Sequence, residues 1–469
     1  MNLAPAAGPL SARNARRLRT LCYILGALIP IGWLLAYRDA PLVADALLWH
    51  VPGAFQQAAS GPSLVTSGPL PGAVLVEGAP VPAQWAGGLP DQAHPPLWYL
   101  WLALFLAAGA TLDAVRVACV LPGVWIGLGF VALADHHRRP WAGLLVWAVP
   151  GVLAQLLRPE LDLGLLCCVP WALLALQRQQ MWTFGVLAAL ATWIKEPGVL
   201  LVVPGLVAAV SRRRGLVPAL LPLLGLAAWA ALNEGLAALM EPPDSATEFF
   251  QNIMDVLSFI WVEQGRFLLI FALLGGGLTA LRLELALALA FCVFFACVRY
   301  QANEGTEHAS NHLRYLLPAV AVWVVGSSAR LRAPLALLQL FFLHRLHGGG
   351  PAVSMTGIDA AYADRAALEA MTPGTRVWVG SDVAAGIGRP WSGFPSMPVR
   401  VYDFYTQPGQ LEVGDRLLIS SFGEPATRLA RSLRLEHELT WTVAEVRSQV
   451  YVVTGQEPGA WAPAVGGPR

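Results

Sequence analysis

The chain has 469 residues, of which 56% are hydrophobic and only 13% are charged, and its formal net charge is +1. This composition is rare among soluble proteins and predicts an all-α protein that crosses a membrane many times. No run of Lys and Arg exceeds three residues, so the sequence gives no support for a basic nucleic-acid-binding patch, and nucleic acid is not an expected partner.

The six cysteines all lie in apolar segments, which argues against a disulfide framework and against a cysteine metal site. The first apolar segment, Leu21–Tyr37, follows four arginines between residues 13 and 19, and no small-residue cleavage site comes after it. We therefore interpret this segment as an uncleaved first membrane span rather than as a signal peptide.

Arginine clusters predict which ends of the apolar segments face the cytoplasm, because cytoplasmic loops carry an excess of positive charge. An even number of crossings must separate one cluster from the next, which leaves about eleven spans with a cytoplasmic N-terminus and an external C-terminus. The predicted spans cover residues 21–37, 115–134, 141–156, 163–176, 181–194, 199–210, 216–232, 267–280, 285–298, 315–325 and 335–346.

The stretch 95–110, PPLWYLWLALFLAAGA, is the apolar segment that the charge rule excludes as a span. As a helix it would reach roughly 24 Å, which is short for a hydrocarbon core of ~30 Å. It opens with two prolines, and its Trp and Tyr side chains favour a membrane interface. We expect a juxtamembrane helix on the outer face, with a true span as the alternative.

The composition changes after the three glycines at 348–350. Helical spacing at 361–371 and 424–435 alternates with strand-like runs at 375–381, 399–404, 415–421 and 448–455. We predict a transmembrane domain over 1–347 with an outer loop at 38–114, a small extracytoplasmic α/β domain over 348–456, and a disordered tail over 457–469. No GxGxxG or P-loop motif predicts a nucleotide site.

Polar residues with chemical potential gather at the predicted outer ends of spans. They lie in DALLWHVPGAF from Asp45, RPELD from Arg158, KEPG from Lys195 and EHASNHLRYLLP from Glu307. Lys195 is the only lysine among the 31 basic residues. An arginine would serve equally well as a snorkelling anchor or as a partner for Glu196, whereas a compact ammonium meets a phosphate as a point charge. We therefore predict a phosphate-binding role for Lys195, with Glu196 as its neighbour.

In their order and spacing these motifs resemble the GT-C superfamily of integral-membrane glycosyltransferases, particularly the dolichyl-phosphate-mannose and aminoarabinose transferase-like group of bacteria. The resemblance covers about residues 17–330. It is carried by Asp45 with His50 and Pro52, Pro-Pro-Leu at 95–97, Arg116, an acidic residue at Glu160 or Asp162, Lys195, and RYLLP at 314–318. One departure is Ala46, where many members of the group have Glu.

The resemblance implies a GT-C-like fold in the bacterial inner membrane. It also implies the transfer of a hexose or pentose from a polyprenyl-phosphate carrier to a glycan, lipid or protein acceptor at the periplasmic face. The catalytic candidates are Asp45 as base or acceptor positioner, His50 and Asp162, and the donor-phosphate candidates are Lys195, Arg314 and Tyr315. Secondary candidates are Glu160, Glu196, His94, His308 and His312. In a tight turn only one of Glu160 and Asp162 can face inward, and we favour Asp162.

Other interpretations of these residues stay open. Asp45 and Asp162 could be helix N-caps, His50 could simply pack, and Arg314 could be an interface arginine. His308 and His312 could hold a divalent ion with a nearby Glu, but the resembled enzymes generally need none, so we expect no metal or other cofactor. The rival functions are a transporter, which would place polar residues near the bilayer midplane, and a non-catalytic membrane scaffold.

Overall fold

The computed structural model describes residues 12–43, 46–62, 94–232, 282–297, 317–326 and 352–455, except 373, 388, 390, 398, 403–407, 420–431 and 444–445. Predictions that lie outside these residues concern Asp45, His308, His312, Arg314, Tyr315, the spans 267–280 and 335–346, and the tail 457–469. The chain divides into two compact units. The helical unit comprises Met1–Ala36, Cys119–Leu156 and Leu161–Pro351, and the mixed unit comprises Tyr37–Ala118, Leu157–Glu160 and Ala352–Arg469.

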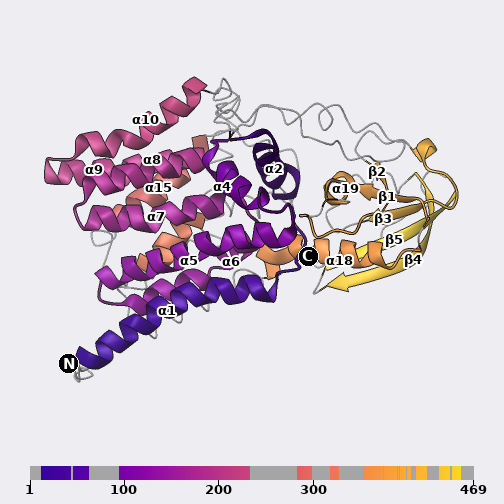
Figure 1. The fold of residues 1–469 in the computed structure, drawn as a ribbon, viewed down its shortest axis with the longest axis horizontal. Helices are drawn as coiled ribbons and strands as arrows, with labels where there is room; N and C mark the ends of the chain where they lie inside the picture. The colour runs from indigo at the N-terminus through magenta and orange to yellow at the C-terminus, as the bar shows by residue number, and fades with distance from the viewer. Residues whose placement is uncertain are drawn as a thin grey trace. The chain divides into compact units, whose positions relative to one another are not determined.

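The described part of the helical unit consists of apolar helices joined by short turns (Figure 1). They are α1 (Ala12–Ala36), most of α5 (Leu112–His136), the 3₁₀ helix η2 (Pro140–Ala148), α6 (Pro150–Leu157), α7 (Leu161–Gln177), α8 (Met181–Ile194), the 3₁₀ helix η3 (Glu196–Leu201), α9 (Val202–Arg212), α10 (Leu216–Leu232), α15 (Arg282–Cys297) and a helix over Leu317–Gly326. The helices α8 and α10 have the same bounds as two of the predicted spans.

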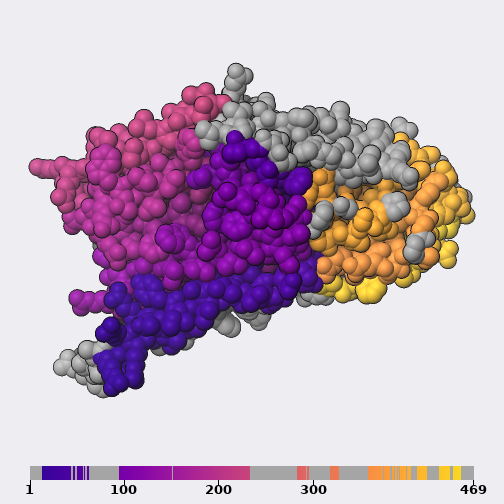
Figure 2. Space-filling model, in the orientation of Figure 1, coloured from indigo at the N-terminus to yellow at the C-terminus, as the bar shows by residue number. Residues whose placement is uncertain are grey.

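Large apolar side chains remain exposed along several of these helices, among them Leu35, Trp182 and Val210. Figure 2 shows α1, in indigo, at the surface of the molecule. Within the described residues, α1 and α5 are long and apolar enough to cross a membrane, and η2 with α6 would add a third span. Helical, membrane-type architecture is therefore evident, whereas the predicted total of about eleven spans is not confirmed.

The predicted continuous span over 141–156 is wrong in one respect, because the chain bends there. The helices η2 and α6 meet at an angle of 68°. Val149, between them, has an extended backbone with φ of −81° and ψ of 109°. It precedes Pro150, whose ring disfavours helical geometry in the residue before it. The predicted span over 199–210 is likewise divided between η3 and α9.

Glycines allow close helix packing in the helical unit. A Cβ atom on Gly127 of α5 would lie 2.0 Å from the carbonyl oxygen of Gly26 in α1. A Cβ atom on Gly185 of α8 would lie 2.5 Å from the carbonyl oxygen of Pro218 in α10. Backbones approach this closely only where the side chain is a hydrogen atom, which is a common device in membrane helices.

The mixed unit combines short helices with a five-stranded sheet (Figure 1). Its described helices include the π-helix η1 (Ala46–His50), α2 (Val51–Ser60), α4 (Leu97–Leu106), α18 (Ala352–Glu369), α19 (Ser381–Gly386) and the 3₁₀ helix η5 (Pro408–Gln410). The strands are β1 (Val377–Gly380), β2 (Arg400–Tyr402), β3 (Arg416–Ile419), β4 (Arg434–Val443) and β5 (Val446–Gly455). Their order is β2-β1-β3-β5-β4.

The strand β1 runs parallel to both neighbours, whereas β5 is antiparallel to β3 and β4. Successive side chains of a strand point to opposite faces. Val377 and Val379 accordingly pack in one apolar cluster, with residues of α18 and α19, and Trp378 packs in another cluster on the opposite face. Helix α18 lies against β4 and β5.

The sequence patterns predicted β1, β2, β3 and β5 correctly, and the predicted helix at 361–371 falls almost wholly within α18. One strand was missed. The predicted helix at 424–435 is wrong at its end, because Arg434 and Leu435 belong to β4. Leu435, His437, Leu439, Trp441 and Val443 alternate with polar residues, and this two-residue period identifies a strand.

Helix α4 contains ten of the sixteen residues of the stretch 95–110. Its length is about 15 Å at the helical rise, which is half of a hydrocarbon core. Trp98, Tyr99 and Leu102 are buried, and α4 packs on α2. A ten-residue helix packed in this way favours the juxtamembrane interpretation over a span.

Candidate functional site

Two of the predicted site residues, Asp162 and Lys195, form a buried ion pair in the helical unit. Helices α7 and α8 are joined by a tight turn in which Gln179 has a φ of 64°, so the start of α7 lies beside the end of α8. Asp162 is in the first turn of α7, and Lys195 directly follows α8. The Nζ atom of Lys195 lies 2.7 Å from Oδ1 of Asp162, and their side chains are 3% and 2% exposed.

The sequence KEPG gives Lys195 a fixed place at the end of α8. Lys195 is extended, with φ of −153° and ψ of 138°, and η3 begins at the next residue. The N–H of Gly198 donates to the carbonyl oxygen of Lys195 at 2.9 Å. A Cβ atom on Gly198 would lie 2.3 Å from the carbonyl carbon of Ala191 in α8. The glycine is therefore needed for η3 to fold back on α8.

The ion pair has an electrostatic consequence. A buried charge is costly unless it is paired, so each partner makes the charged form of the other tolerable. An ammonium has three donors and can bridge a carboxylate and a phosphate oxygen at once. We expected Glu196 to be the neighbour of Lys195. A carboxylate bonded to Nζ belongs to Asp162, which lies 33 positions earlier, and Glu196 is also buried, in η3.

A second group of candidates lies in the mixed unit, around His50. His50 ends the π-helix η1 and is 3% exposed. Its Nδ1 atom lies 3.2 Å from the hydroxyl of Tyr99 in α4, and its ring lies 6.2 Å from that of His94. Single-turn π-helices are rare in proteins, and those that occur are often found at functional sites. The structure therefore brings together the two described histidine candidates, and it adds a tyrosine.

Tyr99 was not among the candidates, because its aromatic neighbours in the stretch 95–110 suggested a membrane-interface role for all of them. The indole of Trp98, next to it, donates to the carbonyl oxygen of Pro159 at 2.8 Å. Sequence spacing carries no signal for the pairing of His50 with Tyr99, since the two residues are 49 positions apart in different helices.

Glu160 is 0% exposed and follows Pro159 in the mixed unit, and Asp162, in the helical unit, is 1% exposed. Both carboxylates are therefore buried, each in its own unit. Glu160 precedes α7 in a tight bend, where its N–H donates to the carbonyl oxygen of Arg158 at 2.6 Å. Asp162 lies in the first turn of α7.

Arg116, which the family resemblance singled out, is 4% exposed in α5. Its Nη1 atom donates to the carbonyl oxygen of Leu157 at 2.5 Å, and its Nη2 atom donates to that of Ala40. The guanidinium thus ties the start of the predicted first outer loop to the end of α6. Among the residues that the structure describes, no group of three or more His, Cys, Asp or Glu side chains could hold a metal ion.

No protein-family model and no curated protein matches the chain. Among solved structures, the chain is similar to two crystal structures of ArnT from Cupriavidus metallidurans, one bound to undecaprenyl phosphate and one in the apo state. The complex with undecaprenyl phosphate has 13% identity and a TM-score of 0.48, covering 98% of this chain and 100% of that chain. The apo structure has 14% identity and a TM-score of 0.49, covering 93% and 98%.

At such identities and TM-scores, a likeness carries no argument about activity. The roles of individual residues therefore depend on the geometry of this chain.

Proposed function

We propose that the chain is a membrane glycosyltransferase that takes a sugar from a polyprenyl-phosphate carrier and transfers it to a glycan, lipid or protein. The observation that carries this proposal is the buried ion pair of Asp162 with Lys195, the sole lysine. Ionisable groups buried in membrane helices are costly and are retained mainly for function. A lysine that is bonded to a carboxylate and buried is suited to bind the phosphate of a lipid-linked donor.

The reaction is a single displacement with inversion at the sugar. An acceptor hydroxyl attacks the anomeric carbon, and a new C–O bond forms. The bond from that carbon to the phosphate oxygen breaks, and its electron pair leaves with the polyprenyl phosphate. The hydroxyl proton passes to a base on the protein. Charge develops on the departing phosphate, which fixed cations stabilise.

Lys195 contacts that phosphate, and Asp162 orients the ammonium by accepting its hydrogen bond. On the acceptor side, His50 is held by Tyr99 and accepts or relays the proton. Asp45, Arg314 and Tyr315 keep their predicted roles as base and phosphate ligands. No metal or other cofactor takes part, so a chelator such as EDTA is expected to leave the rate of transfer unchanged.

The chain is placed in the bacterial inner membrane with its N-terminus in the cytoplasm and its C-terminal region in the periplasm. The support is the distribution of arginines along the sequence. Alkaline phosphatase fused after residue 455 is expected to be active, since it folds only outside the cytoplasm. If the alkaline phosphatase fusion is inactive and a fusion of green fluorescent protein at the same position is fluorescent, the C-terminal region lies in the cytoplasm and the proposed orientation is wrong.

The function is tested by mass spectrometry of envelope glycans from a deletion strain complemented with wild type, Lys195→Arg or the double variant Lys195→Met/Asp162→Leu. The double variant removes both charges of the pair together. Wild type is expected to restore a sugar-sized mass that both variants fail to restore. Native mass spectrometry of purified wild type with undecaprenyl phosphate is expected to show a complex that the double variant forms poorly.

If the strain complemented with the double variant has wild-type levels of the sugar in its envelope glycans, a non-catalytic membrane scaffold explains the protein better than a transferase. Movement of a lipid-linked sugar across vesicles without transfer would favour the transporter.

A further inference from the structure

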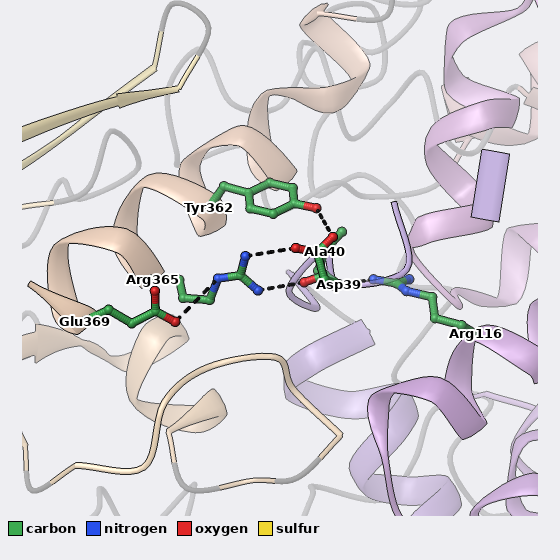
Figure 3. Close-up of polar contacts among 6 residues, drawn as sticks. All are labelled: Asp39, Ala40, Arg116, Tyr362, Arg365 and Glu369. Atoms are coloured by element: carbon green, nitrogen blue, oxygen red, sulfur yellow. Dashed lines mark hydrogen bonds and ion pairs between the residues drawn. The ribbon is translucent and has the colours of Figure 1, made fainter. Parts of the chain in front are cut away.

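Two residues of helix α18 form hydrogen bonds with Asp39, which precedes His50 in the chain (Figure 3). The hydroxyl of Tyr362 donates to Oδ1 of Asp39 at 3.1 Å, and Nη2 of Arg365 donates to Oδ2 at 3.2 Å. The Nη1 atom of Arg365 donates to the backbone oxygen of Asp39 at 2.7 Å. Glu369 lies one turn along α18, with its carboxylate 3.9 Å from Nε of Arg365. Both the side chain and the backbone of Asp39 are therefore fixed.

Two further contacts hold the residues that follow. The guanidinium of Arg116 bonds to the carbonyl oxygen of Ala40. The N–H of Leu42 donates to the carbonyl oxygen of Ser392 at 2.8 Å. The residues Asp39, Ala40 and Leu42 thus each have a bonded backbone group.

Beyond η1, the chain is held again from the C-terminal region. Phe55 of α2 stacks on Trp391, with ring centroids 4.7 Å apart. The guanidinium of Arg389 lies over the ring of Trp391, 5.2 Å from its centroid. Helix α19 packs against η1 itself. Contacts from residues 352–394 therefore bracket His50 on both sides.

We call the contacts of Tyr362 and Arg365 with Asp39 the clamp. The protonation states of Asp39 and Tyr362 preserve the clamp at neutral pH. Burial opposes ionisation of Asp39, but hydrogen bonds from Arg365 and Tyr362 outweigh it and lower the pKa of the carboxyl. Burial, followed by the charge of Asp39, raises the pKa of Tyr362 to about 12. Asp39 is accordingly an acceptor and Tyr362 a donor across the physiological range.

From these contacts we infer that the C-terminal region is part of the acceptor side of the site, and that Arg365 is a positioning residue for His50. The inference rests on the proposed function, because it assigns this region a task in the same transfer reaction. A π-helix is a less favourable backbone form than an α-helix and needs support from its surroundings. A displacement of about 1 Å at a reacting group can cost roughly a hundredfold in rate.

The structural arm of the test is hydrogen–deuterium exchange of the full-length protein in nanodiscs, and it requires no substrate. Arg365→Gln is expected to increase amide exchange in residues 46–60, and Tyr362→Phe to increase it less. The matched control is Arg416→Gln, which removes another partly buried arginine pair, with Glu438, at 2.7 Å and 2.9 Å. This control is expected to leave exchange in 46–60 unchanged. Equal exchange in Arg365→Gln and wild type would overturn the inference.

The functional arm uses undecaprenyl phosphate as a binding probe and the sugar-sized mass in envelope glycans as the product. Arg365→Gln is expected to bind undecaprenyl phosphate as wild type does and to lose roughly tenfold to a hundredfold in product. The reversed pair Asp39→Arg/Arg365→Asp is expected to recover part of that loss. Equal losses of probe binding and product would mean a structural role only, and would overturn the inference.

The two arms separate the two proposals. If wild type makes no product but Arg365→Gln loosens residues 46–60, the proposed function fails while the clamp stands. If wild type makes product and Arg365→Gln makes as much, the positioning role fails while the proposed function stands.

Discussion

One ion pair of the helical unit and two of the mixed unit differ in how far water reaches them. Lys195 and Asp162 of the helical unit are 3% and 2% exposed at 2.7 Å. Arg365 and Asp39 of the mixed unit are 20% and 64% exposed at 3.2 Å, and Arg416 and Glu438 are 24% and 31% exposed at 2.7 Å. Distance alone therefore does not rank these pairs. Water screens the exposed ones, whereas each buried partner depends on the other for its charge.

The largest expected effect is that of breaking the buried pair on one side only. Asp162→Asn leaves the ammonium of Lys195 buried without its carboxylate, and is expected to lower the free energy of unfolding by about 3–5 kcal/mol. Unfolding in mixed micelles with increasing SDS measures this change. The double variant Lys195→Met/Asp162→Leu is expected to regain most of that stability. If Asp162→Asn were as stable as wild type, the pair would not be the buried, coupled unit described above.

A smaller effect is expected from the glycine that shapes the lysine turn. In Gly198→Ala the new methyl group meets the backbone of Ala191 at 2.3 Å, so η3 must move. Strain of this kind costs about 1–3 kcal/mol and displaces Lys195. Gly409→Ala is the matched control, since its Cβ atom would meet nothing within 4 Å. Equal SDS-unfolding curves for the two variants would contradict the packing described for η3.

The mixed unit has its own buried polar contact, between His50 and Tyr99. Tyr99→Phe removes one hydrogen bond and is expected to cost about 1 kcal/mol, with a further loss of transfer product because His50 is no longer oriented. Tyr402→Phe is the control, because its hydroxyl donates to the carbonyl oxygen of Leu418 at 2.8 Å in the sheet. It is expected to lose similar stability and keep its product. If the two variants kept equal amounts of product, His50 would have only a structural role.

The smallest effect concerns Asp39 and depends on pH. The pKa of Asp39 is lowered in the folded protein by its bonds to Arg365 and Tyr362, although burial opposes the shift. Its contribution is thus present above the unfolded pKa of about 3.9 and is lost as the pH falls through the lower folded value. The exposed carboxylate limits the effect to less than about 1 kcal/mol.

The stabilities of wild type and Asp39→Asn are expected to differ at pH ~6 and to converge as the pH falls below ~4. Added salt is expected to reduce the difference in the same way, because the carboxylate is in water. If the difference in stability between wild type and Asp39→Asn grew as the pH fell, the pKa of Asp39 would be raised rather than lowered in the folded protein.

How far the sequence predicted these features depended on the range of the interaction. The ends of α8 and α10 were predicted because Lys195-Glu196-Pro197 and Arg213-Arg214-Gly215 interrupt apolar runs locally. The pairing of Lys195 with Asp162 was not predicted, although both residues were candidates. It depends on the lengths of two helices and on the turn between them.

Longer-range contacts left no local trace at all. Asp39 and Arg365 are 326 positions apart, and each is an ordinary charged residue in its own segment. The choice of partner depends on how the sheet and α18 fold around the loop, which no periodicity encodes. The bend at Val149 was accessible from the following proline, and β4 was accessible from its alternation. Both were missed because the apolar run and the neighbouring helical pattern were given more weight.

Because the chain has a single lysine, acylation of that lysine can report whether the protein around it is folded. The chain contains one ε-amine, and 97% of that side chain is out of reach of solvent. Acylating reagents should modify the N-terminal amine of the folded protein and leave Lys195 unmodified. A second acyl group in the intact mass would then mark molecules in which the turn between α8 and η3 has opened. Detergents and lipids can be compared by this one covalent signature, with no engineered label.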